Sequence, residues 1–322
     1  MHNLRDVVVM SMHFLYTTPD LFNNFDIMTR SKANFIGITS IMIWACMVSG
    51  VKMITEQLGA ILGVALIYSI SALCVAFIDR KYLWQTLPRR YLLICGSCFV
   101  LYEVLFLCSI GLSKTREEAL ILAMINYLWP CFTLFLSYLL GQLNFKAPAF
   151  AGLILSILGL LLIVNPSIVS AEGFIQTLSN NPLAYTLAFC GAILWSLYCV
   201  FTPRYAQGKN GIALFFCLTS VALWLLFCLS DQAWQTPSLS MGLMIIVVGA
   251  LVGIAYKNWN QSLQFGNIQL LLLASYFTPI LSSLMSSLIL HTLPSWSFWL
   301  GTLGVSFGAM LSWKFSTPLR KV

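Results

Sequence analysis

The stretch Ala119–Leu140, ALILAMINYLWPCFTLFLSYLL, decides how this chain is interpreted. It is long enough to cross a bilayer, because a transmembrane helix needs about 20 mostly apolar residues. Its middle, Asn126 to Pro130, nevertheless holds an amide, a phenol, an indole and a proline. Lipid offers no water to satisfy such groups. The stretch therefore predicts a membrane helix that lines an internal cavity.

The composition of the whole chain indicates a membrane protein. Of its 322 residues, 59% are hydrophobic and 8% are charged, whereas soluble domains carry roughly a quarter charged residues. The apolar runs reach spanning length and lack the alternation of transmembrane β-strands. We predict an all-α polytopic membrane protein with ten spans, at 34–51, 59–78, 91–112, 118–140, 148–165, 183–202, 211–230, 241–259, 268–290 and 295–313.

The basic residues predict the orientation of these spans. Most lysines and arginines fall in segments that share one side of the membrane with both termini. Because cytoplasmic loops are enriched in these residues, we expect both termini in the cytoplasm. The net charge of +7 follows from this bias, and no basic run suggests nucleic-acid binding.

The two halves of the chain resemble each other. Superposing Pro130 on Pro279 also superposes these pairs: Tyr127 on Tyr276, Gly152 on Gly301, and Gly159 on Gly308. With five spans in each half, the second copy must enter the membrane in the opposite orientation. We predict a 5+5 inverted-topology repeat, in which the substrate site lies near the midplane between the repeats. The repeated glycines are expected at close helix contacts.

The domain boundaries follow from the repeat. The five predicted segments are a cytoplasmic tail (1–31, with an alternative start at Met28), a first repeat (32–166), an external linker (167–182), a second repeat (183–314) and a cytoplasmic tail (315–322).

The prolines and the polar residues near them are the first candidate site. Proline removes a backbone hydrogen bond from a helix, so Pro130 and Pro279 at equivalent positions predict paired hinges or broken helices. The polar residues expected to line a cavity at these breaks are Asn126, Tyr127 and Trp129 in the first half, and Ser275 and Tyr276 in the second.

Two charged residues also lie within spans. Glu103 follows Tyr102 in LYEVLF, and Lys257 follows Tyr256 in AYKNWNQ. Intramembrane charges mark functional sites by default. Glu103 is expected either to hold a substrate cation or exchange protons, or to pair with Lys257 inside the bundle. Lys257 has the further alternative of extending to the cytoplasmic edge.

Aromatic residues complete the predicted site. Trp195 and Tyr198 offer ring faces to a flat ligand or an ammonium group, whereas Trp44 is expected to serve helix packing. Cys95 and Cys98 form a CxxC within a span, with no second pair and no histidine nearby. We therefore expect no metal and no cofactor.

These residues carry a resemblance to a known family. The ten-span layout, with NYLWP, LYEVLF, AYKNWN and SYFTPILSS, resembles the drug/metabolite transporter superfamily of EamA-type proteins. Within it, the sequence is similar to the YddG-type aromatic amino-acid exporters. The resemblance covers residues 28 to about 314 and implies a basket-like fold with a central cavity. It departs at Lys257, where the family suggests a small residue.

The resemblance implies a secondary transporter of the bacterial inner membrane. It would export aromatic or other hydrophobic amino acids by alternating access, as a monomer in the lipid bilayer. The alternative is export of another small metabolite or a cationic drug such as methyl viologen, which a buried Lys257 would repel. A membrane enzyme or a non-transporting scaffold is disfavoured, because the sequence shows no catalytic motif and the repeat implies a pathway.

Overall fold

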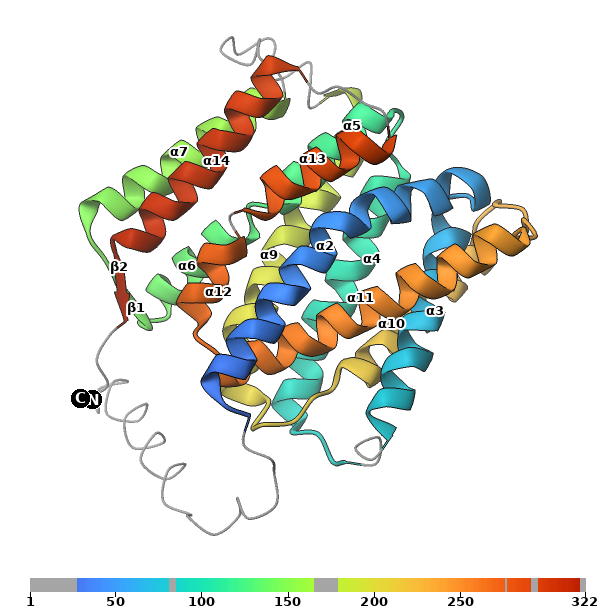
Figure 1. The fold of residues 1–322 in the computed structure, drawn as a ribbon, viewed down its shortest axis with the longest axis horizontal. Helices are drawn as coiled ribbons and strands as arrows, with labels where there is room; N and C mark the ends of the chain where they lie inside the picture. Colours follow the sequence, from blue (N-terminus) through green and yellow to red (C-terminus); the bar gives the residue numbers. More distant parts are fainter. Residues whose placement is uncertain (1–27, 81–84, 165–178, 276, 291–294, 319–322) are drawn as a thin grey trace, which may run out of the picture.

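The computed structural model describes residues 28–80, 85–164, 179–275, 277–290 and 295–318 (Figure 1). Tyr276, the predicted tail before residue 28, most of the expected linker 167–182 and the last four residues lie outside these ranges.

Helices dominate both halves of the chain. The first half contains α2 (Arg30–Leu58), α3 (Ala60–Ile78), the π-helix η3 (Tyr91–Gly96), α4 (Ser97–Gly111), α5 (Arg116–Asn126), α6 (Trp129–Leu139), β1 (Leu143–Phe145) and α7 (Ala147–Val164). The second half contains α9 (Pro182–Tyr205), α10 (Ile212–Leu229), α11 (Leu239–Phe265), α12 (Ile268–Ser275), α13 (Thr278–Leu290), α14 (Trp296–Lys314) and β2 (Ser316–Pro318). The two short strands pair antiparallel, with Leu143 opposite Pro318.

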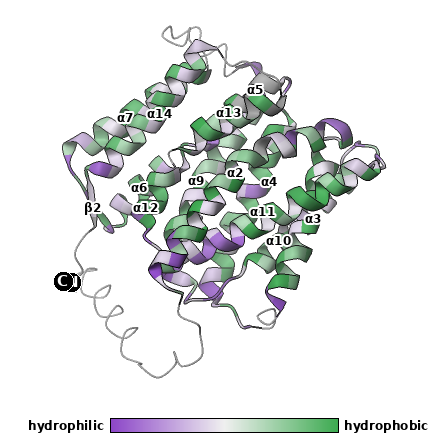
Figure 2. Ribbon diagram, viewed as in Figure 1, coloured by the Kyte–Doolittle hydropathy of each residue, from purple (hydrophilic) through white to green (hydrophobic). Residues whose placement is uncertain are grey.

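The helices have the character of membrane spans. Within the described ranges, six helical segments are long and apolar enough to cross a bilayer, and α2 is a seventh when its bent parts are joined. Large apolar side chains also cover the outside, including Leu73, Phe77, Leu225 and Phe307. Figure 2 shows hydrophobic residues along the helices and hydrophilic ones concentrated towards helix ends. Because soluble monomers rarely expose large apolar surfaces, the fold is that of a polytopic α-helical membrane protein.

Side-chain caps define where several helices begin. The first backbone N–H groups of a helix lack intrahelical partners, and here a polar side chain three residues earlier accepts one of them. These N-caps are Thr29, Thr115, Asn181, Ser238 and Ser295. Between α2 and α3 the chain turns at Gly59, whose φ of 86° is a conformation that favours glycine.

Two helices are broken at equivalent places. The run Ala119–Leu140 forms α5 and α6, with Pro130 in the first turn of α6, where its missing N–H is not needed. The carbonyl of Trp129 accepts a hydrogen bond from the Ser196 hydroxyl at 2.8 Å. In the second half, α12 ends at Ser275 and α13 begins at Thr278. The sequence therefore anticipated where both helices are interrupted.

The halves pack against each other along several helix pairs. The closest associations are α7 with α14, α2 with α11, α3 with α10, and α4 with α9, and Figure 1 shows α7 and α14 side by side at one edge. A Cβ on Gly152 would lie 2.4 Å from the Gly308 carbonyl oxygen, and one on Gly301 would lie 2.5 Å from that of Gly159. The prediction that these glycines mark close helix contacts is confirmed.

Candidate functional site

Trp195 of α9 lies at the centre of the bundle, with 2% of its surface exposed. Its ring centroid is 4.9 Å from those of Tyr102 and Tyr198, and 5.4 Å from that of Tyr256. Trp129 of α6 makes an edge contact at 6.2 Å. The structure thus brings together five residues that the sequence predicted for the site, from α4, α6, α9 and α11.

Further aromatic residues join them. Trp44 of α2 lies 5.0 Å from Tyr256 and 5.2 Å from Trp259, centroid to centroid. The expectation that Trp44 serves helix packing fits these contacts, but its partners are site residues, and its buried indole N–H has no hydrogen-bond partner in the part of the chain that the structure describes. Trp259 and Phe99 are fully buried among the same rings. We call the whole set the central aromatic cluster: Trp44, Phe99, Tyr102, Trp129, Trp195, Tyr198, Tyr256 and Trp259.

Sequence reasoning left Trp259 and Phe99 out of the site. Trp259 follows Tyr256 by three residues, so the two share a helix face, and this spacing was the available signal. Phe99 sits in an ordinary apolar run and gave none.

Glu103 of α4 is buried beside the cluster, with 1% of its surface exposed. The hydroxyl of Tyr68 in α3 donates a hydrogen bond to Oε2 of Glu103, and the phenols of Tyr102 and Tyr256 lie nearby. The other carboxylate oxygen, Oε1, has no hydrogen-bond partner among the described residues. A buried acid without a cation is costly, so this oxygen is suited to a cation supplied from outside the chain.

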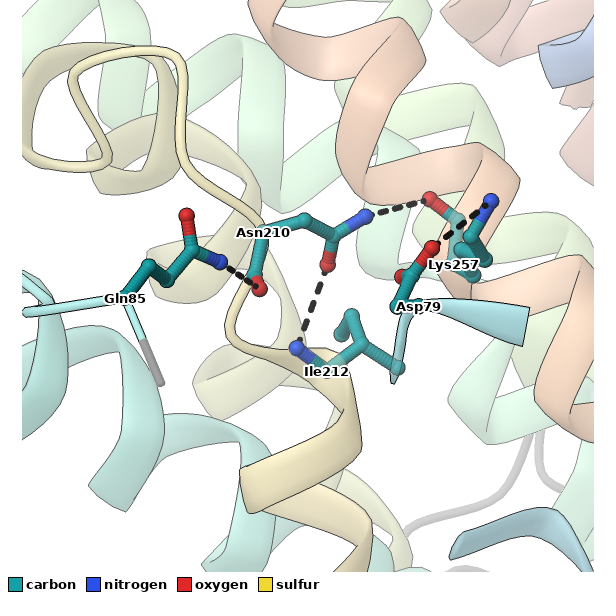
Figure 3. A network of polar contacts seen from close by, with 5 residues as sticks. All are labelled: Asp79, Gln85, Asn210, Ile212 and Lys257. Carbon is teal, nitrogen blue, oxygen red and sulfur yellow. Dashed lines mark hydrogen bonds and ion pairs between the residues drawn. The ribbon is translucent and has the colours of Figure 1, made fainter. Parts of the chain in front are cut away.

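Of the two alternatives for Glu103, the structure does not show the pair with Lys257. Lys257 Nζ instead lies 3.4 Å from Asp79 Oδ1, just beyond the end of α3, as Figure 3 shows. Successive helical residues point about 100° apart because a turn takes 3.6 residues. Tyr256 therefore faces the cluster while Lys257 faces α3. Lys257 lies outside the central cluster, so the expectation that a buried cation there repels dications loses its basis.

The polar residues at the α5–α6 break point in different directions. Asn126 is 5% exposed and its Nδ2 donates to Tyr102 Oη at 3.4 Å, while its Oδ1 has no partner among the described residues. Tyr127 instead packs in a second apolar cluster that includes Leu128 and Phe298. Asn126 therefore borders the central aromatic cluster, whereas Tyr127 packs in the second apolar cluster.

The second break is described only in part. Ser275 is buried, but its hydroxyl donates to the Leu272 carbonyl of its own helix at 2.7 Å. Pro279 lies in the first turn of α13. Tyr276 lies outside the described residues.

A buried polar network adjoins one side of the cluster and was not anticipated. Asn260 Nδ2 donates to Tyr198 Oη at 2.6 Å and to Tyr91 Oη at 2.7 Å. Gln264 Nε2 donates to Asn260 Oδ1 at 2.8 Å. Tyr198 therefore presents its ring to the cluster while its hydroxyl is held by α11, which fixes the ring's orientation.

Together these groups suit a ligand that is partly flat and apolar and partly cationic. Rings on five helices offer stacking and edge contacts, and an ammonium group is attracted both to ring faces and to a carboxylate. Within the described residues, no group of three or more histidine, cysteine or acidic side chains has metal-binding geometry.

Comparisons with known proteins point the same way. Residues 182–314 match the EamA-like transporter family. The chain is 36% identical over 287 residues to the aromatic amino acid exporter YddG of Salmonella typhimurium, and 35% identical over 287 residues to that of Escherichia coli K12. Each match covers 89% of this chain and 98% of the relative. A YddG exporter from Ancylobacter novellus is 27% identical over 269 residues, covering 80% of this chain and 88% of the relative.

The fold also has a counterpart among solved proteins. A crystal structure superposes with a TM-score of 0.65 and 23% identity, covering 88% of this chain and 96% of its own. At this identity the match shows that the two chains share a fold.

Proposed function

Because the chain belongs to the EamA-like transporter family and, within it, to the group of the YddG exporters, we propose that it exports aromatic or other hydrophobic amino acids across the bacterial inner membrane. The observation that carries this proposal is the central aromatic cluster with Glu103 buried beside it, whose Oε1 has no hydrogen-bond partner among the described residues. Its relatives are named as exporters, so the activity is transport, with no enzymatic step.

The substrate's two chemical parts match two parts of the site. The α-ammonium group would bind Glu103 Oε1, with Asn126 Oδ1 as a second acceptor that has no partner among the described residues. The aromatic side chain would lie among the rings of Trp129, Trp195 and Tyr102. Hydrogen bonds to charged groups contribute about 1.5–3 kcal/mol, and each aromatic contact adds about 0.5–1.5 kcal/mol beyond burial.

The proposed architecture is ten spans in a 5+5 inverted repeat, forming a basket with a central cavity. The packing pairs support it. In the proposed repeat, each helix of the first half has a counterpart in the second half. The α2–α11 contact then corresponds to α9–α4, and α13–α2 corresponds to α6–α9. The α3–α10 and α7–α14 contacts each join a helix to its own counterpart. The family match at residues 182–314 coincides with the proposed second repeat, 183–314, and leaves 32–166 as the first. Alternating access would follow from rocking of the halves, with Pro130 and Pro279 at the bending points.

The proposed orientation places both termini in the cytoplasm. The end of the bundle bearing Arg80, Arg89, Arg90, Arg204 and Lys209 would then face the cytoplasm, as the positive-inside bias requires. Residues from both halves form the central aromatic cluster within one chain, so the monomer is the proposed transporting unit.

Export from loaded cells tests the proposal. Cells that carry the gene should release labelled phenylalanine, tyrosine and tryptophan faster than cells with an empty vector. Equal release from both would refute amino-acid export.

The second candidate function is export of a cationic drug. It is favoured by the pairing of Lys257 with Asp79, which leaves Glu103 beside aromatic rings without a competing lysine. Growth protection separates the two candidates, because resistance to methyl viologen without resistance to toxic phenylalanine analogues would favour the drug.

A further inference from the structure

A separate cavity lies where α3 ends and α10 begins. Its volume is about 300 Å³, which is within the range of small-molecule sites. One wall is apolar, formed by Leu87, Leu92 and Leu214, and Asp79 and Asn210 contribute polar groups. Asp79 follows Tyr68 by eleven residues, which places the cavity roughly 16 Å along α3 from the level of Glu103.

The Asp79–Lys257 ion pair joins the two halves at the edge of this cavity: Asp79 lines the cavity, and Lys257 lies behind it in contact with Asp79. Each side chain is 15% exposed, and the Nζ–Oδ1 contact of 3.4 Å is long for a charge-assisted hydrogen bond. Burial raises the pKa of the Asp79 carboxyl, and Lys257 offsets part of that rise. The two side chains are therefore half-buried and are joined by one long contact.

The side-chain amides near the ion pair form hydrogen bonds with backbone groups, not with the two charged side chains. Asn210 Nδ2 donates to the Lys257 carbonyl at 3.2 Å, and its Oδ1 accepts from Ile212 N at 3.1 Å. Gln85 Nε2 donates to the Asn210 carbonyl at 3.0 Å. Figure 3 shows these hydrogen bonds with the ion pair beside them. The pair can then separate without the loss of these backbone bonds.

We propose that this cavity is a cytoplasmic vestibule that binds the zwitterionic backbone of an amino acid, with the ammonium group on Asp79 and the carboxylate on Lys257. The apolar wall would contact the side chain. The inference rests on the proposed function for its direction of transport, but it concerns a site distinct from the central aromatic cluster.

The vestibule would couple substrate binding to separation of the two halves at the cytoplasmic end. A zwitterion offers each charged side chain a new partner of opposite sign. The Asp79–Lys257 contact can therefore break without leaving either charge unpaired. Because Asp79 belongs to the first half and Lys257 to the second, this exchange releases one connection between the halves at the cytoplasmic end. A ligand with only one of the two charges would leave a buried charge unpaired and would bind weakly.

Cys217 reports occupancy of the vestibule, because it lines the cavity and is exposed. Purified full-length protein in phosphatidylcholine nanodiscs is treated with N-ethylmaleimide with and without phenylalanine, and each cysteine is quantified by mass spectrometry. Cys46 and Cys228 are exposed elsewhere and serve as internal references. At a phenylalanine concentration about four times its Kd, occupancy alone slows labelling of Cys217 about fivefold.

Analogues and variants identify the groups responsible. Phenethylamine, which lacks the carboxylate, and 3-phenylpropionate, which lacks the ammonium group, should give little protection. Asp79→Asn and Lys257→Gln should each abolish protection by phenylalanine, and the exchange Asp79→Lys with Lys257→Asp should restore part of it. Trp195→Ala, which alters the central aromatic cluster, should leave the protection of Cys217 in place.

Several results would overturn the vestibule. They are no protection of Cys217 by phenylalanine, protection that persists in both single variants, or protection that disappears in Trp195→Ala. Protection by phosphatidylethanolamine in the nanodisc but not by phenylalanine would assign the cavity to a lipid headgroup.

Transport by the same preparations separates the two proposals. Phenylalanine transport without protection refutes only the vestibule, whereas protection without transport refutes the proposed function.

Discussion

Tyr68 donates a hydrogen bond to one oxygen of Glu103, and the other oxygen has no partner among the described residues. The two residues lie on α3 and α4, next to Tyr256 of α11. The phenol stabilises and orients the carboxyl group, and Oε1 accepts no hydrogen bond from the described residues. In the proposed site, Glu103 is therefore the acidic group beside the aromatic rings.

Replacing Glu103 by Gln should reduce phenylalanine export. The amide keeps the shape of the side chain but removes the negative charge, at a cost of about 1.5–3 kcal/mol of ammonium binding, equivalent to roughly a 10- to 100-fold rise in KM. Export from loaded cells measures the effect, with membrane abundance checked by immunoblot. Asp231→Asn, at an exposed site, is the matched control, and a KM equal to wild type would remove Glu103 from the site.

Replacing Trp129 or Trp195 by Ala should also impair export. Each loses ring contacts worth about 0.5–1.5 kcal/mol beyond burial, so KM for phenylalanine should rise at least severalfold, and Phe at the same position should recover part of the loss. Trp296→Ala, at a side chain that is 84% exposed, should change little. Equal effects at Trp296 and Trp195 would mean that the cluster has no special role.

Enlarging Gly152 should destabilise the protein. A Cβ there would lie 2.4 Å from the backbone oxygen of Gly308, so Gly152→Val forces α7 and α14 apart, at a cost of about 1–3 kcal/mol. Thermal unfolding in detergent should show a lower Tm. Gly242→Ala, which meets nothing within 4 Å, should unfold as wild type does, and an unchanged Tm for Gly152→Val would contradict the close packing.

Acidification should weaken the proposed vestibule. Burial raises the pKa of Asp79, against the opposing effect of Lys257, so this carboxylate takes up a proton at a higher pH than an ordinary aspartate does. As the pH falls through that raised pKa, Asp79 loses its charge and the ammonium group loses its partner. The protection ratio of Cys217, measured with and without phenylalanine at each pH, should fall accordingly. Protection that persists well below pH 4 would contradict the role given to Asp79.

Much of the architecture was predictable because membranes impose simple rules. Apolar length located the helices, and the paired prolines located both breaks, because proline's missing hydrogen bond has a cost in lipid wherever it occurs. The glycine contacts were also predictable, since Gly152 and Gly159 recur as Gly301 and Gly308 in the second half.

Side-chain direction was harder to predict. Glu103 and Lys257 fall at similar positions in the two halves of the sequence, which suggested a pair as one alternative. The rotation of α11 instead directs Lys257 towards Asp79, a residue at a helix end that attracted no attention in the sequence. Tyr127 was assigned to the site through its neighbours Asn126 and Trp129, but it faces a different cluster. Trp259 was left out of the predicted site, because its contact with Trp44 becomes evident only once the helices are packed together.

Counterflow in liposomes measures amino-acid exchange by the purified protein alone. Purified wild-type protein, reconstituted with unlabelled phenylalanine inside, should accumulate external labelled phenylalanine transiently, and tyrosine and tryptophan should compete with it. Glu103→Gln should lose this uptake, and a pH gradient applied to the wild type shows whether protons are exchanged. Wild-type liposomes that take up no more label than empty ones would contradict the account, as would undiminished uptake by Glu103→Gln.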